Sequence, residues 1–263
     1  MKNLSAFLVL SLASAVLLGS CAVYVPATPN TPLLRSQGEV EITASFRPQG
    51  SLETSAAWVP AEHILLTAEG GWQQSDGSET RNGVTTNFQS IHKQAGIGIG
   101  TYRLLGADKS VYLGAVGGFG LASASIYDSH FDPFDFLFGG FEQLAHYQAT
   151  YQRYHGQLYV AKTTPLVSYG ASLRTTFVHY SELTRNNVPI TTPTNFYFEP
   201  TMFVRIGRGA FQGQTTLGFS QPTAPNRASP DRRNVSPVGT IMSFGVVFRP
   251  HLLKRYGAGL PTE

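Results

Sequence analysis

Cysteine and charge are both scarce in this sequence. Its 263 residues include a single cysteine, Cys21, so no disulfide can form within the chain. Asp, Glu, Lys and Arg together make up 13% of the residues, about half of the usual quarter. The formal charge of +3 is scattered along the chain and forms no basic patch, which a nucleic-acid-binding protein would need. The composition therefore excludes a disulfide-built scaffold and predicts no nucleic-acid partner.

Long apolar runs are also missing after Leu18. No later stretch approaches the eighteen residues that a transmembrane helix needs, so the mature chain is predicted to have none. Glycine (27 residues) and aromatic residues (12%) are plentiful instead. The remaining way to cross a bilayer is a closed β-barrel, whose alternating strands do not stand out as apolar runs.

The N-terminus has the features of a secretory signal. A basic residue, Lys2, precedes an apolar stretch over 4–18, which is too short and too early for a spanning helix. The ending Leu17-Leu18-Gly19-Ser20-Cys21 resembles the lipobox of bacterial lipoproteins. That resemblance implies removal of residues 1–20, a lipid anchor on Cys21 and export by a bacterium. The alternative is an ordinary cleaved signal with an incidental cysteine.

Ten segments beyond residue 38 alternate apolar with polar or glycine residues. This period of two is typical of a β-strand with two different faces. In the first segment Val40, Ile42, Ala44 and Phe46 share one face. The ten segments are 39–47, 51–59, 63–73, 89–103, 110–126, 150–162, 167–179, 195–207, 211–220 and 240–248. Pro200 interrupts the eighth, and because proline removes a ladder donor, a bulge or local distortion is expected there.

The joins between these segments alternate in length, except that the first join, over 48–50, is short where a long one would be expected. Short joins follow the second, fourth, sixth and eighth segments, and long joins occupy 74–88, 127–149, 180–194 and 221–239. Transmembrane barrels have short periplasmic turns and longer outer loops. The pattern predicts an all-β, antiparallel, up-and-down transmembrane β-barrel over 38–250, of ten strands, with eight as the alternative count. Residues 21–37 are predicted to be an extended tether and residues 251–263 a periplasmic tail.

The architecture and the signal together resemble small outer-membrane β-barrel proteins of Gram-negative bacteria that begin as lipoproteins. The resemblance covers residues 1–250 and implies location in the cell outer membrane, contact with its lipids and a monomer. An even strand count would place both the N-terminus and the C-terminus in the periplasm. The resemblance brings no catalytic motif, so it implies fold and location rather than activity.

The polar faces of the strands carry charges of both signs. Because an unpaired buried charge is costly, these side chains are predicted to pair inside the lumen. Arg174 on the preceding strand is the predicted partner of Glu199, and Arg205 is expected to pair with a neighbouring strand. Rings of one sign, which an ion-selective channel would favour, are not evident. The predicted network comprises Glu69, Arg153, Arg174, Glu199 and Arg205.

The remaining sequence motifs predict no nucleotide-binding or metal-binding site. The glycines of the run 96–100 alternate within a strand, so they are expected to face inward and make room for bulky neighbours, not to form a nucleotide loop. The acidic residues near Asp128 lack the ligand spacing of a calcium loop, so no metal or other cofactor is predicted. The same join is rich in phenylalanine and is predicted either to cover the barrel or to contact a partner or lipid. Its aromatic residues are Phe131, Phe134, Phe136, Phe138 and Phe141.

A hydrolase could use Ser172, His155, His179 and Glu199, but no G-x-S-x-G motif accompanies them, so the chain is predicted not to be an enzyme. The predicted role is structural or interactive, through the outer loops. A narrow pore or transporter for small solutes is the main alternative, followed by a barrel lipid hydrolase. A soluble ligand-binding barrel is the last alternative, since the strand period would be the same if the apolar faces pointed inward.

Overall fold

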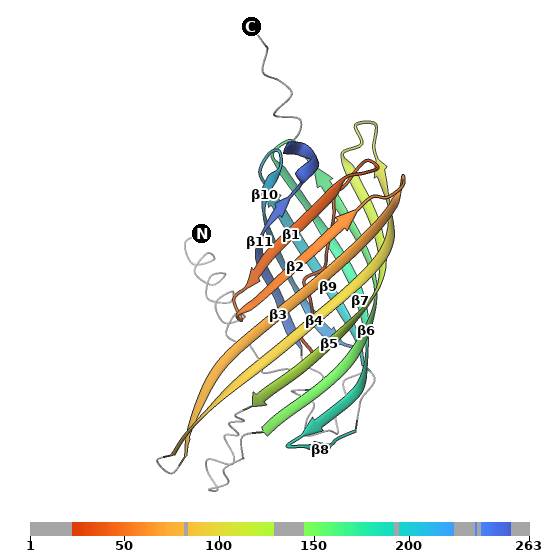
Figure 1. Ribbon diagram of the computed structural model, residues 1–263. Helices are drawn as coiled ribbons and strands as arrows, with labels where there is room; N and C mark the ends of the chain where they lie inside the picture. The colour runs from red at the N-terminus through yellow and green to blue at the C-terminus, as the bar shows by residue number, and fades with distance from the viewer. Residues whose placement is uncertain are drawn as a thin grey trace, which may run out of the picture.

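The protein is a closed antiparallel β-barrel (Figure 1). The computed structural model describes residues 23–81, 84–128, 145–191, 195–223, 235 and 238–253. Ten strands form the ring in chain order, and β1 pairs with β11 to close it. The predicted ten-stranded barrel is therefore confirmed. The strands of the ring are β1 (Val40–Arg47), β2 (Ser51–Trp58), β3 (Ile64–Arg81), β4 (Val84–Leu105), β5 (Val111–Asp128), β6 (Ala145–Thr163), β7 (Val167–Arg185), β9 (Asn195–Ile206), β10 (Phe211–Pro222) and β11 (Gly239–Phe248). The two-residue strand β8 (Val188–Pro189) only extends the end of β7.

The joins divide the barrel into two ends. The short-join end carries the connections β2–β3, β4–β5, β6–β7 and β9–β10, and also the 3-10 helix η1 (Pro250–Leu252) that follows β11. The opposite end, the long-join end, carries the connections from β3, β5, β7 and β10. At the β4–β5 join, the hydroxyl and the backbone N–H of Ser110 both donate to the carboxylate of Asp108, at 2.8 and 3.2 Å. These two hydrogen bonds lower the pKa of the Asp108 carboxyl.

Several strands extend further than predicted at the long-join end. The pairing of β3 with β4 continues to Arg81 and Val84, so the join expected over 74–88 is mostly strand. Likewise β6 already begins at Ala145 and β7 continues to Arg185, within joins expected over 127–149 and 180–194. The loop assignment over 74–88 was wrong because most side chains in the β3–β4 extension are polar on both faces and give no apolar period. At the start of β6 and the end of β7 the apolar residues change to the inward face, which interrupts the outward apolar period.

Pro200 does not produce a register shift. The pairing of β9 with β7 runs without interruption from Asn195 to Ile206. On the other side, the pairing of β9 with β10 is interrupted opposite Pro200, between Thr201 and Phe198, and resumes in the same register. The expected bulge is therefore not at Pro200; proline causes only a local interruption of the ladder, and a register shift lies between Thr150 and Tyr151 of β6.

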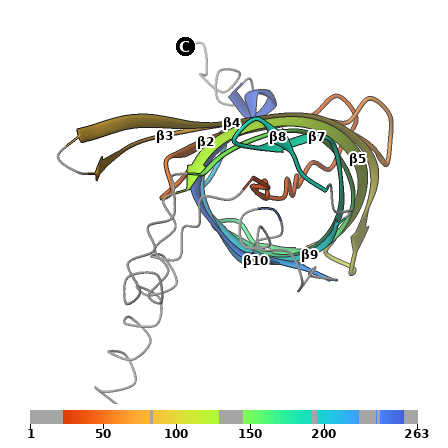
Figure 2. The ribbon, with the colours of Figure 1, turned by 90° about the horizontal axis from the view of Figure 1, so that it is seen from below.

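The chain before β1 lies inside the barrel. We call residues Val23–Arg35 the plug. Val23, Tyr24, Leu33 and Leu34 are all buried, and the segment crosses the centre of the ring seen along the barrel axis (Figure 2). Its beginning packs in a cluster at the long-join end, and its last residue, Arg35, hydrogen-bonds Thr163 at the short-join end. The segment expected as a tether is extended, but its position within the lumen was not predicted.

Candidate functional site

The apolar faces of the strands point away from the lumen. Ile97, Leu158 and Met202 are 68%, 60% and 71% exposed on the outer surface. The alternate residues of the same strands point inward and include buried Arg153, Arg174 and Arg205. A soluble barrel would have the opposite arrangement, with polar side chains facing water outside. The outer face is thus built to contact hydrocarbon.

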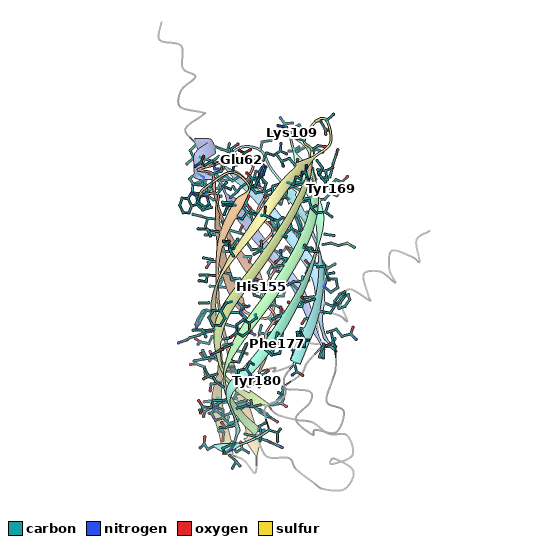
Figure 3. The ribbon with its side chains drawn as sticks, turned by 90° about the vertical axis from the view of Figure 1, so that its right-hand side faces the viewer. Glu62, Lys109, His155, Tyr169, Phe177 and Tyr180 are labelled. Atoms are coloured by element: carbon teal, nitrogen blue, oxygen red, sulfur yellow. The ribbon has the colours of Figure 1, made fainter. Side chains whose placement is uncertain are left out.

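Aromatic side chains lie on this outer face at two levels. Phe119, Tyr154, Phe177 and Phe196 form a continuous row across β5, β6, β7 and β9, with centroid separations of 5.2, 6.1 and 4.8 Å. We call this set the aromatic row. Tyr169 lies on β7 eight residues before Phe177 and nearer the short-join end (Figure 3). Eight residues span about 27 Å along a strand. Because the strands of such barrels tilt by ~40° from the barrel axis, this is about 21 Å along the axis. This spacing is close to the apolar band, about 25 Å tall, of transmembrane barrels.

The side-chain pattern reverses beyond the aromatic row, towards the long-join end. There the outward residues are polar and the inward residues are apolar, as in a barrel standing in water. On β5 the change follows Leu121, and on β7 it follows Phe177. Outward residues in this part include Ser123, Gln148, His179 and Ser181, and buried inward residues include Ala122, Ala124, Ile126, Tyr147, Val178 and Tyr180. The reversal marks where the apolar environment ends.

The five residues of the predicted lumen network all point into the barrel. Arg174 pairs with Glu199 at 2.7 Å between adjacent strands β7 and β9. Arg153 pairs with Glu69 at 2.7 Å, from β6 to β3. Arg205 pairs with Glu41 at 3.0 Å, from β9 to β1. The last two pairs join strands that are not neighbours. The neighbouring-strand partner expected for Arg205 is Gln214 on β10, which accepts from its Nε at 2.7 Å, whereas its counterion Glu41 comes from β1. Ring closure, which the sequence pattern does not specify, brings these strands within reach.

Two further pairs were not part of the predicted network. Arg47 lies 3.3 Å from Glu53 across the β1–β2 hairpin, and both side chains are buried. Arg249, just after β11, lies 2.8 Å from Glu41, so that Glu41 contacts two arginines. The sequence signal for Glu41 and Glu53 was their position on the polar face of alternating strands. The charges on these faces were predicted to pair inside the lumen, but the pattern did not identify the partners of Glu41 and Glu53.

Inward glycines make the room that these long side chains need. A Cβ on Gly120 would lie 2.7 Å from Nε of Arg153 and 2.8 Å from the carbonyl oxygen of Ala95. A Cβ on Gly118 would lie 2.4 Å from the ring of His155. In the run 96–100, for which bulky neighbours were expected, the glycines instead allow close approach of adjacent strands: a Cβ on Gly100 would lie 2.2 Å from the carbonyl oxygen of Ala115, and one on Gly98 would lie 2.6 Å from Oγ1 of Thr67.

Three of the ion pairs also hold the plug. Arg47, Arg174 and Arg205 each pair with a glutamate and also donate to a plug carbonyl. Their glutamates each accept a hydrogen bond from the plug. We call these the clasp pairs: Arg47–Glu53, Arg174–Glu199 and Arg205–Glu41. Arg153–Glu69 has no hydrogen bond to the plug within the described part of the chain.

Tyrosines close the lumen towards the long-join end. The ring of Tyr24 stacks on Tyr197 with centroids 4.1 Å apart and meets Tyr151 edge-on at 6.0 Å. His92 lies 2.7 Å from the hydroxyl of Tyr151. All four residues are buried. A packed aromatic layer therefore covers the beginning of the plug.

A small cavity lies between the plug and the wall. It measures about 20 Å³, lies beside Thr28, and is lined by small and hydroxyl-bearing residues and by the polar side chains of Glu53, Glu69, Gln94, Arg153 and Gln214. A single water needs roughly 10–15 Å³ of such space. The lumen in this conformation has no room there for a solute larger than water.

The hydrolase-type residues are not brought together. His179 points outward while Ser172 is buried inside, and Glu199 is engaged by Arg174. On the outer face, Ser125 lies 2.9 Å from a ring nitrogen of His146, but the described residues place no carboxylate against the other ring nitrogen to complete a triad. The described residues contain no group of three metal ligands and no helix long and apolar enough to cross a membrane.

Two sets of predicted site residues lie outside the described part of the chain. One is the proposed lipidation site, Cys21, and the other is the phenylalanine-rich contact segment. The latter comprises Phe131, Phe134, Phe136, Phe138 and Phe141.

Comparisons with known proteins find similarity in structure only. No protein-family model matches the sequence, and neither does any curated protein. Fourteen chains of solved structures match. One is the translocator domain of the autotransporter NalP from Neisseria meningitidis, at 11% identity and a TM-score of 0.45, covering 81% of this chain and 89% of that one. Another is OmpT, an outer membrane protein of Vibrio cholerae, at 9% identity and 0.27, covering 80% and 63%. A third is Acinetobacter baumannii CarO2, at 9% identity and 0.24, covering 82% and 100%. Because every one of these three TM-scores is below 0.5, the function has to follow from the geometry of this chain.

Proposed function

We propose that this chain is an outer-membrane β-barrel lipoprotein of a Gram-negative bacterium, closed by its own plug. It acts as a structural or interaction protein that presents its long joins outside the cell. The observation that carries this proposal is the reversal of the side-chain pattern at the aromatic row. A band of apolar outward residues between Tyr169 and Phe177 fits a bilayer, and the polar part beyond Phe177 fits water.

A pore or transporter is the second candidate, and the buried ion pairs weigh against it. Four lumen arginines and four lumen glutamates pair across the interior, and the plug occupies the axis. The lumen of an eight-stranded barrel can be filled by its own side chains, and the lumen of a ten-stranded barrel is only slightly wider. The small size of the cavity beside Thr28, about 20 Å³, supports a closed barrel.

The boundary of the apolar band gives a first prediction. Leu158→Arg places a charge on the outer face of β6 within the band, and it should cost about 2–4 kcal/mol of folding free energy. Gln148→Arg, on the same face of the same strand but beyond the aromatic row, should cost almost nothing. Urea unfolding in lipid vesicles, followed by heat-modifiable gel mobility, measures both. Equal stabilities for the two variants would contradict a bilayer at this position.

The topology gives a second prediction. Cysteines at Ser78 and Asn187, at the long-join end, should react on whole cells with a thiol reagent that cannot cross the outer membrane. A cysteine at Asp108, in the β4–β5 join, should react only after the cells are opened. The natural Cys21 stays in place in every variant. The opposite labelling pattern would place the long joins in the periplasm.

The lipid anchor gives a third prediction. Mass spectrometry of the mature N-terminal peptide should find residue 21 as the first residue, carrying acyl groups. The Cys21→Ser variant should lose this mass and still fold, because the barrel begins only at β1. A mature protein with an unmodified N-terminus at another residue, such as Ala22, would remove the lipoprotein part of the proposal.

A further inference from the structure

The plug has a composition unlike the strands around it. From Val23 to Leu34 it contains no charged side chain, and prolines recur at positions 26, 29 and 32. A spacing of three matches the three residues per turn of a polyproline II helix, an extended form without internal hydrogen bonds. Because proline has no N–H, such a segment offers more carbonyl acceptors than N–H donors to its surroundings. A barrel wall rich in hydrogen-bond donors can therefore bind such a segment through its carbonyl groups.

The lumen supplies donors for these carbonyls. Arg205 Nη2 donates to Thr31 at 2.7 Å, Gln157 Nε2 to Asn30 at 2.7 Å, and the Tyr159 hydroxyl to Pro32 at 2.9 Å. Arg47 and Arg174 donate to the carbonyls of Pro26 and Ala27. Five carbonyls of the plug therefore accept from lumen side chains within the described structure.

The glutamates of the clasp pairs complete the contacts. Glu53 accepts from the N–H of Thr28 at 3.2 Å, and Glu41 accepts from the N–H of Leu33 at 3.4 Å. Glu199 accepts from the hydroxyl of Tyr24 at 2.8 Å. Each clasp pair thus offers a donor and an acceptor to the same peptide, and most of these contacts are to its main chain. Since each charge already has its partner, a charged side chain on the ligand would find no counterion.

We propose that the lumen is a binding site for an extended peptide whose buried part is uncharged and has proline at every third residue, and that residues 23–35, charged only at the exposed Arg35, occupy it as a ligand supplied by the same chain. The three clasp pairs recognise the main chain of the peptide and its direction. The inference deepens the proposed function, because it rests on a barrel that its own plug closes. It follows that the same sequence should bind without a covalent link to β1.

The experiment separates the plug from the barrel after the full chain is made. A specific protease site replaces the exposed turn 36–38, and the purified full chain is cut there. The cut protein is unfolded in urea and refolded in detergent with a tenfold excess of a fluorescent synthetic peptide of residues 23–35. By mass action roughly nine-tenths of the folded barrels should then carry the labelled peptide. Folded, heat-modifiable barrels are separated on a gel and their fluorescence is measured.

Two comparisons make the result specific. A peptide of the same composition with the prolines moved to adjacent positions should be captured at least tenfold less. Arg205→Lys keeps the charge opposite Glu41 but loses the planar group that also reaches Thr31, so capture should fall about tenfold. Arg153→Lys makes the same exchange at a pair that has no hydrogen bond to the plug among the described residues, and capture should stay unchanged.

Each result of this experiment either supports or contradicts peptide binding in the lumen. Equal capture of the rearranged peptide, or folded barrels without label, would overturn it. Failure of the cut protein to refold with the peptide, under conditions where the uncut variant refolds, would also overturn it. The uncut variant tests the proposed function separately, because it can fold and remain non-conducting whether or not peptide capture occurs.

Discussion

Deleting residues 23–35 should convert a non-conducting barrel into one with a steady ion conductance. The intact protein in a planar bilayer should show no large steady open level, since the plug and the tyrosine layer around Tyr24 fill the lumen. Without the plug, the clasp pairs face an axial space that water enters. With Arg249 beside Glu41, five arginines face four glutamates, so the expected conductance favours anions only weakly.

The control for this measurement is the fold of the deletion variant. Its heat-modifiable mobility on a gel should match that of the intact protein before any bilayer recording is interpreted. A folded deletion variant that does not conduct would mean that the wall side chains alone close the barrel. A stable porin-like level in the intact protein would favour the transporter alternative.

Glu199→Ala should be the most destabilising single substitution in the lumen. Glu199 is fully buried and accepts from Arg174 at 2.7 Å, Tyr24 and Thr176 at 2.8 Å and Ser220 at 3.0 Å. Removing the carboxylate leaves the Arg174 charge buried without compensation, which costs about 3–5 kcal/mol. The shift in the urea midpoint of the protein folded in detergent measures the loss.

Two variants separate this effect from a general weakening. Glu62→Ala removes an exposed carboxylate at the short-join end, paired with His63 at 3.4 Å, and should cost below ~1 kcal/mol. Arg174→Met added to Glu199→Ala should recover part of the loss, because the uncompensated charge is then gone. If the double variant is less stable than Glu199→Ala alone, the cost does not come from the unpaired arginine.

The strands could be predicted from the sequence because their apolar period of two is local. Residues such as Ile97 and Gly96 identify the two faces of β4 without any knowledge of its neighbours. That pattern alone could not tell which face pointed outward, since a membrane barrel and a soluble barrel share it. The exposed Ile97, and the reversal beyond Phe177 on β7, provide the answer only once the ring is closed.

The plug could not be predicted because a proline-containing extended segment has no period that distinguishes a free tether from a bound ligand. The absence of charge between Val23 and Leu34 was the one available signal. The partner of Arg205 was missed for a related reason. Glu41 lies 164 residues earlier in the chain and three strands around the ring, and only closure brings the two together.

The plug also changes how many times the chain crosses from one end of the barrel to the other. Ten strands alone would return the chain to the side where it started, and β1 and η1 do lie at the same end. The plug adds an eleventh passage, so Val23 lies at the opposite end from the C-terminal helix. Both chain ends were expected in the periplasm; among the described residues Val23 and η1 lie at opposite ends of the barrel, and the residues before Val23 and after Leu253 lie outside the described part of the chain.

The plug reaches from the short-join end, where Arg35 hydrogen-bonds Thr163, to the long-join end, where Val23 packs. Because a closed ring has no lateral entrance, this segment reaches the lumen either along the barrel axis or before β1 and β11 pair.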